Sequence, residues 1–144
     1  MRQQDIPICV IDDDGSVRIA LKRLINAWGF NVKTFKSAEE FLGSGLFQSF
    51  GVLILDVRMP GMSGLELQKR LTEENSELPV IFVSAYDDIQ VRTTAMEAGA
   101  VAFLQKPVEE RDLVDAVEQA LDRQPNEIPG RSSPGDTGGI FSEP

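Results

Sequence analysis

The sequence predicts an α/β fold in which a doubly wound parallel sheet of five strands is covered by helices on both faces. Three observations predict it. Five short apolar segments recur along the first hundred or so residues, and stretches with helical periodicity lie between them. The length of 144 residues, with 42% hydrophobic content, suits one domain with one sizeable core.

The five apolar segments are the expected strands. The first, third and fourth are nearly continuous and rich in β-branched residues, which is typical of strands buried on both faces of a parallel sheet. The second alternates apolar and polar residues, so we expect it at an edge of the sheet. The segments occupy residues 6–11, 30–35, 52–55, 79–84 and 101–104.

A helix is expected after each strand. The first has the apolar stripe of an amphipathic helix and ends at Gly29, and the second begins at Ser37 with a capping-box pattern, Ser37-Ala-Glu-Glu. The third is expected over about 63–74 and the fourth over about 88–98, before Gly99. The apolar stripes of the first and last helices are Val17, Ala20, Leu21, Leu24, Ile25 and Trp28, and Leu113, Val114, Val117, Ala120 and Leu121.

The composition changes after Arg123. Residues 125–144 are rich in Gly, Pro and Ser and have neither helical nor strand periodicity. Such a segment buries too little apolar surface to offset the entropy of ordering it. We therefore expect a folded domain over residues 1–124 and a flexible linker or tail over residues 125–144.

The composition also excludes several kinds of chemistry. The chain has no His and a single Cys, Cys9, which excludes His-based catalysis, an internal disulfide and a multi-cysteine zinc site. Fourteen basic against 23 acidic residues give a formal charge of -9, which argues against a nucleic-acid-binding surface. No apolar run approaches the ~20 residues that span a bilayer, and no signal peptide opens the chain. We expect a cytoplasmic protein without a membrane partner.

Reactive side chains follow four of the expected strands. In an open parallel sheet, ligands bind beyond the carboxyl ends of the strands, where the strand order reverses. These side chains should therefore meet at one edge. They are Asp12, Asp13 and Asp14 after the first strand, Asp56 after the third, Ser84 at the end of the fourth and Lys106 after the fifth.

Each of these side chains has an ordinary interpretation when taken alone. The acidic run fits a solvated turn with Asp14 or Ser16 as the N-cap of the next helix, and Asp56 and Lys106 fit polar strand ends that face water. Taken together, these side chains indicate a site for metal-assisted phosphoryl transfer. Acids suit a hard cation such as Mg²⁺, a hydroxyl and an ammonium suit phosphoryl oxygens, and a carboxylate among them suits the formation of an aspartyl phosphate.

These are also the residues on which the sequence resembles the receiver domain of bacterial two-component response regulators. The resemblance covers about residues 6–123. The stretch Leu55-Asp-Val-Arg-Met-Pro-Gly-Met-Ser-Gly-Leu-Glu-Leu67 is especially similar to FixJ-type (LuxR-class) regulators. The resemblance implies a flavodoxin-like (βα)5 fold.

The resemblance also implies a role for each site residue. Asp56 is the phospho-acceptor, and Mg²⁺ (or Mn²⁺) is held by Asp12, Asp13, Asp56 and the backbone carbonyl of Arg58. Ser84 is the switch hydroxyl and Lys106 contacts the phosphoryl group. Two further features are implied, namely the switch aromatic Phe103 and a cis peptide bond before Pro107.

The implied function is a phospho-accepting switch that catalyses only its own phosphorylation and dephosphorylation. Because the chain has no His, the phosphoryl group must come from a partner sensor histidine kinase or a small phosphodonor. Phosphorylation would remodel the face of the fourth helix, fifth strand and fifth helix, which forms the homodimer in FixJ-type relatives. Candidates on this face, half of which are equally suited to the core, are Ile89, Val91, Arg92, Ala95, Val101 and Phe103.

Control of transcription would need a DNA-binding output domain that this chain does not contain. The chain is therefore expected to be either a receiver cut from a longer regulator or a single-domain receiver with a natural tail.

Two other functions would use some of the same residues. A haloacid-dehalogenase-type phosphohydrolase would use Asp12 as the nucleophile and Asp14 as the acid. That class places a late acidic pair after its Lys, whereas the only comparable pair here, Asp87-Asp88, precedes Lys106. The second alternative is a receiver-like binding module that is never phosphorylated. It is disfavoured because all five key positions of the receiver site are intact, namely Asp12, Asp13, Asp56, Ser84 and Lys106. Arg58 and Tyr86 flank the site and are candidates for tuning the attack of water on the phosphoryl group.

Overall fold

The chain folds as a five-stranded parallel sheet with helices on both faces, which confirms the predicted fold class. The computed structural model describes residues 7–122, so the expected tail over 125–144 lies outside the described residues. The strands are β1 (Ile8–Ile11), β2 (Val32–Phe35), β3 (Val52–Asp56), β4 (Val80–Ser84) and β5 (Ala102–Gln105). The helices are α1 (Gly15–Ala27), α2 (Ala38–Ser44), a short 3-10 turn η2 (Phe47–Ser49), α3 (Gly64–Glu73), α4 (Ile89–Glu97) and α5 (Glu110–Asp122).

The strand order is β2-β1-β3-β4-β5, and every neighbouring pair is parallel. β2 lies at an edge, as its alternating sequence predicts. The chain moves outward from β1 to β2 and then crosses to β3 on the other side of β1. The strand order therefore reverses between β1 and β3, and the carboxyl ends of these two strands are where a ligand site is expected.

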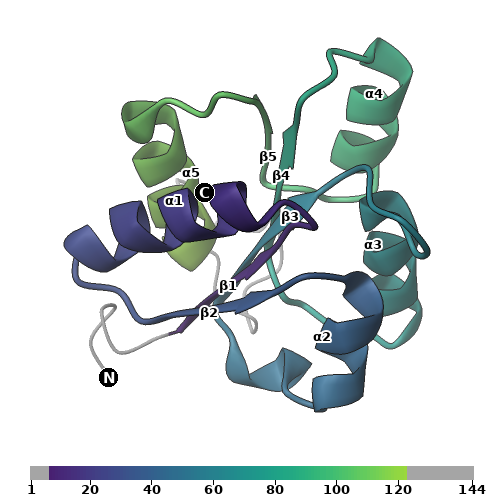
Figure 1. Ribbon diagram of the computed structural model, residues 1–144. Coiled ribbons are helices and arrows are strands. Elements are labelled where there is room, and N and C mark those ends of the chain that lie inside the picture. Colours follow the sequence, from purple (N-terminus) through teal and green to yellow (C-terminus); the bar gives the residue numbers. More distant parts are fainter. Residues whose placement is uncertain (1–6, 123–144) are drawn as a thin grey trace, which may run out of the picture.

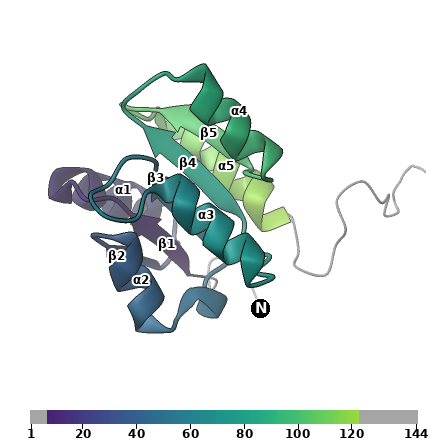
Figure 2. The ribbon, with the colours of Figure 1, turned by 90° about the vertical axis from the view of Figure 1, so that its right-hand side faces the viewer.

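The core has two halves because the central strands are buried on both faces. Cys9 and Ile11 of β1 pack with α2, α3 and α4, whereas Ile8 and Val10 pack with α1 and α5. β3 and β4 alternate in the same way. α1 and α5 accordingly cover one face, and α2, α3 and α4 cover the other (Figures 1 and 2).

All five strands begin or end one or two residues from the expected positions, and proline explains the late starts of β1 and β4. β1 starts after Pro7 and β4 after Pro79. Proline has no N–H to donate to the ladder. Each of these prolines nevertheless accepts a hydrogen bond through its carbonyl, Pro7 from Gly51 N (2.9 Å) and Pro79 from Leu53 N (2.9 Å).

The structure corrects one prediction about the helix ends, namely the capping box at Ser37. Asp14, one of the two predicted candidates, is the N-cap of α1. Ser37 caps α2, but the capping box predicted there is incomplete, because Glu40 Oε1 accepts from Lys36 N (2.9 Å) and not from the cap residue itself. The complete capping box belongs to α3, between Ser63 and Glu66.

α4 is the least buried of the long helices. Ala95 is its single buried residue, whereas α5 buries five. A buried amide supplements this small apolar contact, since Gln68 Nε2 of α3 donates to the backbone carbonyl of Ala95 (3.0 Å). No helix among the described residues has the length and apolar character needed to cross a membrane.

Candidate functional site

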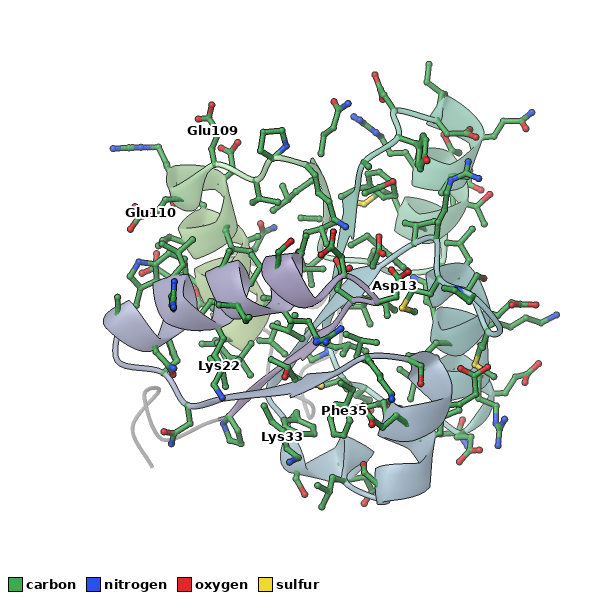
Figure 3. All side chains as sticks on the ribbon, in the orientation of Figure 1. Asp13, Lys22, Lys33, Phe35, Glu109 and Glu110 are labelled. Carbon is green, nitrogen blue, oxygen red and sulfur yellow. The ribbon has the colours of Figure 1, made fainter. Side chains whose placement is uncertain are left out.

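Three acids meet at the point where the strand order reverses. Ile11 of β1 lies opposite Leu55 of β3, so Asp12 and Asp56, which follow them, extend from neighbouring strand ends. Carboxylate oxygens of Asp12, Asp13 and Asp56 all lie within 4.8 Å of one another. Asp12 and Asp56 are buried, and Asp13, labelled in Figure 3, is exposed at the rim.

Lys106 lies between the two buried acids. Its Nζ is 2.8 Å from Asp12 Oδ2 and 3.4 Å from Asp56 Oδ1. β5 is next to β4 and not next to β1, so the lysine reaches the acids with its long side chain. The peptide bond between Lys106 and Pro107 is cis.

The electrostatics of the site follow from this geometry. Burial, followed by the nearby Asp12 carboxylate, raises the pKa of Asp56 from 3.8 to about 7, although Lys106 opposes the rise. Burial alone would lower the pKa of Lys106, but Asp12 and Asp56 beside it more than offset burial, and the pKa is raised. The ammonium therefore stays charged, and one positive charge faces three carboxyl groups.

This arrangement fits a divalent cation. Asp12 Oδ2 is fully buried and accepts no hydrogen bond of good geometry, and Lys106 supplies the positive charge beside it. The three acids come from two strand ends, and Asp13 is open to solvent. Carboxylate oxygens are the ligands that a hard cation such as Mg²⁺ prefers. The acidic pocket is thus compatible with a divalent metal site.

The loop between β3 and α3 brings a helix start against Asp56. Gly64 N donates to Val57 O (2.8 Å), and a Cβ on Gly64 would run into the backbone carbonyl oxygen of Asp56. A side chain is therefore excluded at Gly64. At its outer end the loop is held by α2, because Glu39 Oε2 accepts from Met62 N (2.8 Å).

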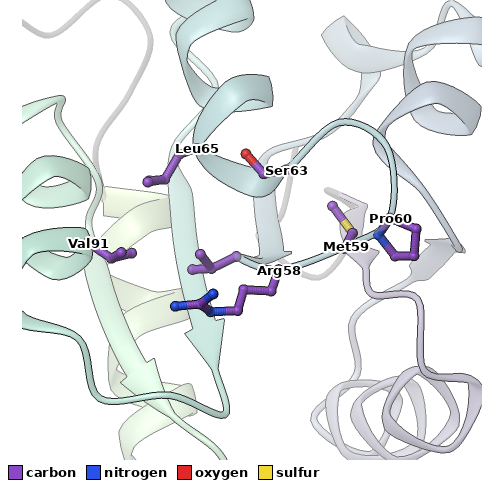
Figure 4. Close-up of a pocket in the computed structure, with 7 residues that line it drawn as sticks. Arg58, Met59, Pro60, Ser63, Leu65 and Val91 are labelled. Atoms are coloured by element: carbon purple, nitrogen blue, oxygen red, sulfur yellow. The ribbon is translucent and has the colours of Figure 1, made fainter.

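Arg58 extends from this loop toward the loop between β4 and α4. Its guanidinium carbon lies 4.6 Å from the centre of the Tyr86 ring, and its Nη2 lies 3.7 Å from Asp88 Oδ2. On the side toward α3 and α4, the Arg58 side chain borders an open hollow that Ser63, Leu65 and Val91 also line (Figure 4).

Ser84 and Phe103 lie on β4 and β5, beyond the strand that ends at Asp56. Ser84 is buried at the end of β4, and its Oγ accepts from Tyr86 N (3.1 Å). Phe103 is partly buried on β5, with its ring 6.1 Å from that of Phe82 and the Arg92 guanidinium 5.4 Å above it. Among the other face candidates, Ala95 and Val101 are core residues, whereas Ile89 is 74% exposed.

The structure thus brings together the predicted residues Asp12, Asp13, Asp56 and Lys106. One contact to this group was not foreseen from the sequence, namely that Arg18 of α1 donates from Nη1 to the backbone carbonyl of Asp12 (2.6 Å). A signal for it exists in the sequence, since a cation in the first turns of a helix is unfavourable beside the helix dipole and needs a local reason. The partner of Arg18 cannot be read from that signal.

Comparison with known proteins defines the class. The family model described as "Response regulator receiver domain" matches residues 8–118, and the chain belongs to this family of signalling regulators. The match confirms the resemblance inferred from the sequence, and it favours that interpretation over a haloacid-dehalogenase-type fold.

Particular relatives come from regulators of transcription. The chain is 46% identical over 114 residues to the transcriptional regulatory protein TdiR of Thauera aromatica, covering 79% of this chain and 50% of TdiR. It is 40% identical to the transcriptional regulatory protein FixJ of Bradyrhizobium diazoefficiens, covering 79% of this chain and 56% of FixJ. The solved structure of FixJ-N superposes with a TM-score of 0.77 at 36% identity, covering 85% of this chain and 98% of that one. The chain spans about half the length of the curated relatives it matches.

Proposed function

We propose that this chain is a phosphorylation switch that accepts a phosphoryl group on Asp56 from the phosphohistidine of a sensor histidine kinase. The observation that carries the proposal is the cluster of Asp12, Asp13, Asp56 and Lys106 at the strand ends of a receiver-family domain. Asp56 Oδ attacks phosphorus, a P–O bond forms, and the P–N bond to the donor imidazole breaks. The imidazole keeps the electron pair and takes up a proton from solvent.

The neighbouring residues suit this transfer. Asp12, Asp13, Asp56 and the carbonyl of Arg58 would hold Mg²⁺ or Mn²⁺, which when bound neutralises the crowded carboxylates and the phosphoryl oxygens. Lys106 is already 3.4 Å from Asp56 Oδ1, so its ammonium contacts a phosphoryl oxygen after a small shift. Asp56 must be ionised to attack, and its raised pKa of about 7 means that metal-free protein holds it partly protonated at neutral pH.

The response to phosphorylation would run through Ser84 and Phe103. Ser84 donates its hydroxyl to a phosphoryl oxygen, and Phe103 packs into the space that Ser84 leaves. The face of α4, β5 and α5 is remodelled and forms a homodimer. The small buried contact of α4 supports this, since an element with few buried residues is displaced at low cost. Control of transcription would act through a DNA-binding output domain. The receiver domain itself would act as a phospho-accepting switch that catalyses only its own phosphorylation and dephosphorylation.

Incubation with phosphoramidate and Mg²⁺, followed by intact mass spectrometry, tests the proposal. We expect a gain of one phosphoryl group that is absent in Asp56→Asn and after chelation, and present in Asp115→Asn, which alters an exposed acid of α5. Size-exclusion chromatography of the same samples tests dimer formation. Unmodified protein at saturating donor would indicate a binding module. Turnover of the donor by Asp56→Asn but not by Asp12→Asn would indicate a dehalogenase-type hydrolase.

A further inference from the structure

Arg18 occupies an unusual place for a cation. It is the fourth residue of α1, close to the positive end of the helix dipole, where a basic side chain is disfavoured. Three acids precede the helix, yet among the described residues Arg18 forms no ion pair within 4.0 Å. Its guanidinium donates from Nη1 to the backbone carbonyl of Asp12 at 2.6 Å.

The path of the side chain is closely fitted. The guanidinium turns back over Gly15, where a Cβ would lie 3.3 Å from Nη2. Arg18 is half-buried, so its hydrogen bond is less exposed to competition from water than one at the surface. A charged donor on a carbonyl at this distance is stronger than a neutral pair.

Arg18 adds the contact that fixes the carbonyl of Asp12. The other contacts hold the remaining parts of this residue: Asp14 N donates to Asp12 Oδ1 (2.9 Å), Lys106 lies 2.8 Å from Oδ2, and Asp12 N donates to Phe35 O (3.2 Å). None of these contacts fixes the peptide group that joins Asp12 to Asp13. The hydrogen bond from Arg18 to the Asp12 carbonyl does, and it therefore sets the direction in which both acids leave β1.

We propose that Arg18 is a positioning residue that holds the loop after β1 so that Asp12 and Asp13 present their carboxylates to one divalent cation. This inference rests on the proposed Mg²⁺-dependent phosphorylation. It makes Arg18 part of the metal site's supporting structure, although Arg18 contributes no ligand atom.

The direction in which Mg²⁺ affinity changes when Arg18 is replaced distinguishes this role from a simple charge effect. Removing a positive charge near a cation site strengthens cation binding by Coulomb's law. Removing a group that orients the ligands weakens it, by about tenfold at the low end of the range for residues that support metal ligands. Loss of Arg18 subjects the site to both effects, and the positioning role predicts net weaker binding.

The experiment is isothermal titration calorimetry of Mg²⁺ into the parent chain, Arg18→Met and Lys22→Met. Lys22 is the matched control, because it is an exposed cation one turn further along α1 and lies away from Asp13 (Figure 3). We expect the Mg²⁺ dissociation constant to rise about tenfold in Arg18→Met and to stay level or fall in Lys22→Met. Unchanged or tighter Mg²⁺ binding in Arg18→Met would overturn the proposal. This titration needs no phosphodonor, so its outcome is independent of whether Asp56 is phosphorylated.

Two further readouts exclude a merely structural role. In Arg18→Met, amide hydrogen exchange at Asp14 N, measured without metal, should speed up relative to the parent and Lys22→Met. With phosphoramidate, the half-saturating Mg²⁺ concentration should rise while the rate at saturating Mg²⁺ stays within roughly twofold. Amide exchange at Asp14 as slow as in the parent, or an unchanged half-saturating Mg²⁺ concentration, would count against the proposal. Arg18→Gln, which retains a polar side chain, provides the same test if the Met variant does not fold.

Discussion

Replacing Asp56 with Asn should stabilise the metal-free protein at high pH. The folded chain holds the Asp56 carboxyl among Asp12, Asp13 and buried apolar residues, and this burial raises its pKa from 3.8 to about 7. Between pH 4 and 7 the folded state therefore binds more protons than the unfolded state. Stability falls as the pH rises through this window.

The size of the effect follows from the same values. A rise from 3.8 to about 7 corresponds to an upper limit of ~4 kcal/mol above pH 7. Asn keeps the shape but never ionises, and its amide needs hydrogen bonds of its own, which offsets part of the gain. We expect Asp56→Asn to exceed the parent by about 2 kcal/mol at pH 8, half of that upper limit.

Urea denaturation in the presence of a chelator at pH 5, 6, 7 and 8 measures the difference. The gap between Asp56→Asn and the parent should widen from pH 5 to 7 and level off above it. Asp115→Asn, on the exposed side of α5, should stay within about 0.5 kcal/mol of the parent throughout. Added Mg²⁺ should narrow the gap, since the parent gains more binding energy. Equal stability at pH 8, or a gap independent of pH, would refute the argument that burial and Asp12 destabilise an ionised Asp56.

Three further predictions concern the surroundings of Asp56. Lys106→Met should lower the free energy of unfolding of the metal-free protein by about 2 kcal/mol or more, because it leaves the buried Asp12 without a cation. Arg70→Met, which removes the exposed ion pair with Glu74, should cost less than about 0.5 kcal/mol. Similar losses for the two variants in urea denaturation would contradict this prediction. Gly64→Ala should lower the thermal unfolding midpoint, because the new Cβ would clash with the Asp56 carbonyl. Gly43→Ala should raise the midpoint, because Gly43 lies in α2 with nothing within 4 Å of a new Cβ, and Ala is a better helix former than Gly. Arg58→Ala and Tyr86→Ala should each shorten the lifetime of phosphorylated Asp56 if the two side chains, which stack on each other, hinder the attack of water. Lifetimes equal to that of the parent would remove this role.

Local sequence patterns were enough to predict the fold. Continuous β-branched runs such as 52–55 identify strands buried on both faces, because both faces of a central strand are covered in an α/β sheet. The same patterns locate Asp12, Asp56, Ser84 and Lys106 at strand ends, and parallel strands end at a common edge. These inferences depend on neighbouring residues along the chain, and so a single sequence carries them.

The contacts between elements needed the tertiary structure. Glu40 has the spacing of a capping box, yet its carboxylate accepts a hydrogen bond from Lys36 N and not from Ser37 N. The spacing alone does not decide which of these two N–H groups the carboxylate binds. Ala95 and Ile89 both fit the helical pattern of α4, yet one is buried and the other is 74% exposed, because α4 buries so little surface that its sequence does not specify which face is covered.

Local sequence patterns specify which residue types arrive at the edge of the sheet, since strand and helix periodicities are properties of the local backbone. The contacts that hold those residues there come from the packing of the elements. Lys106 reaches Asp12 across two intervening strands, Glu39 of α2 holds the loop that follows Asp56, and Arg18 binds the carbonyl of Asp12. The physical reason is that such contacts depend on how elements cross and how far side chains reach, and neither quantity has a period along the chain.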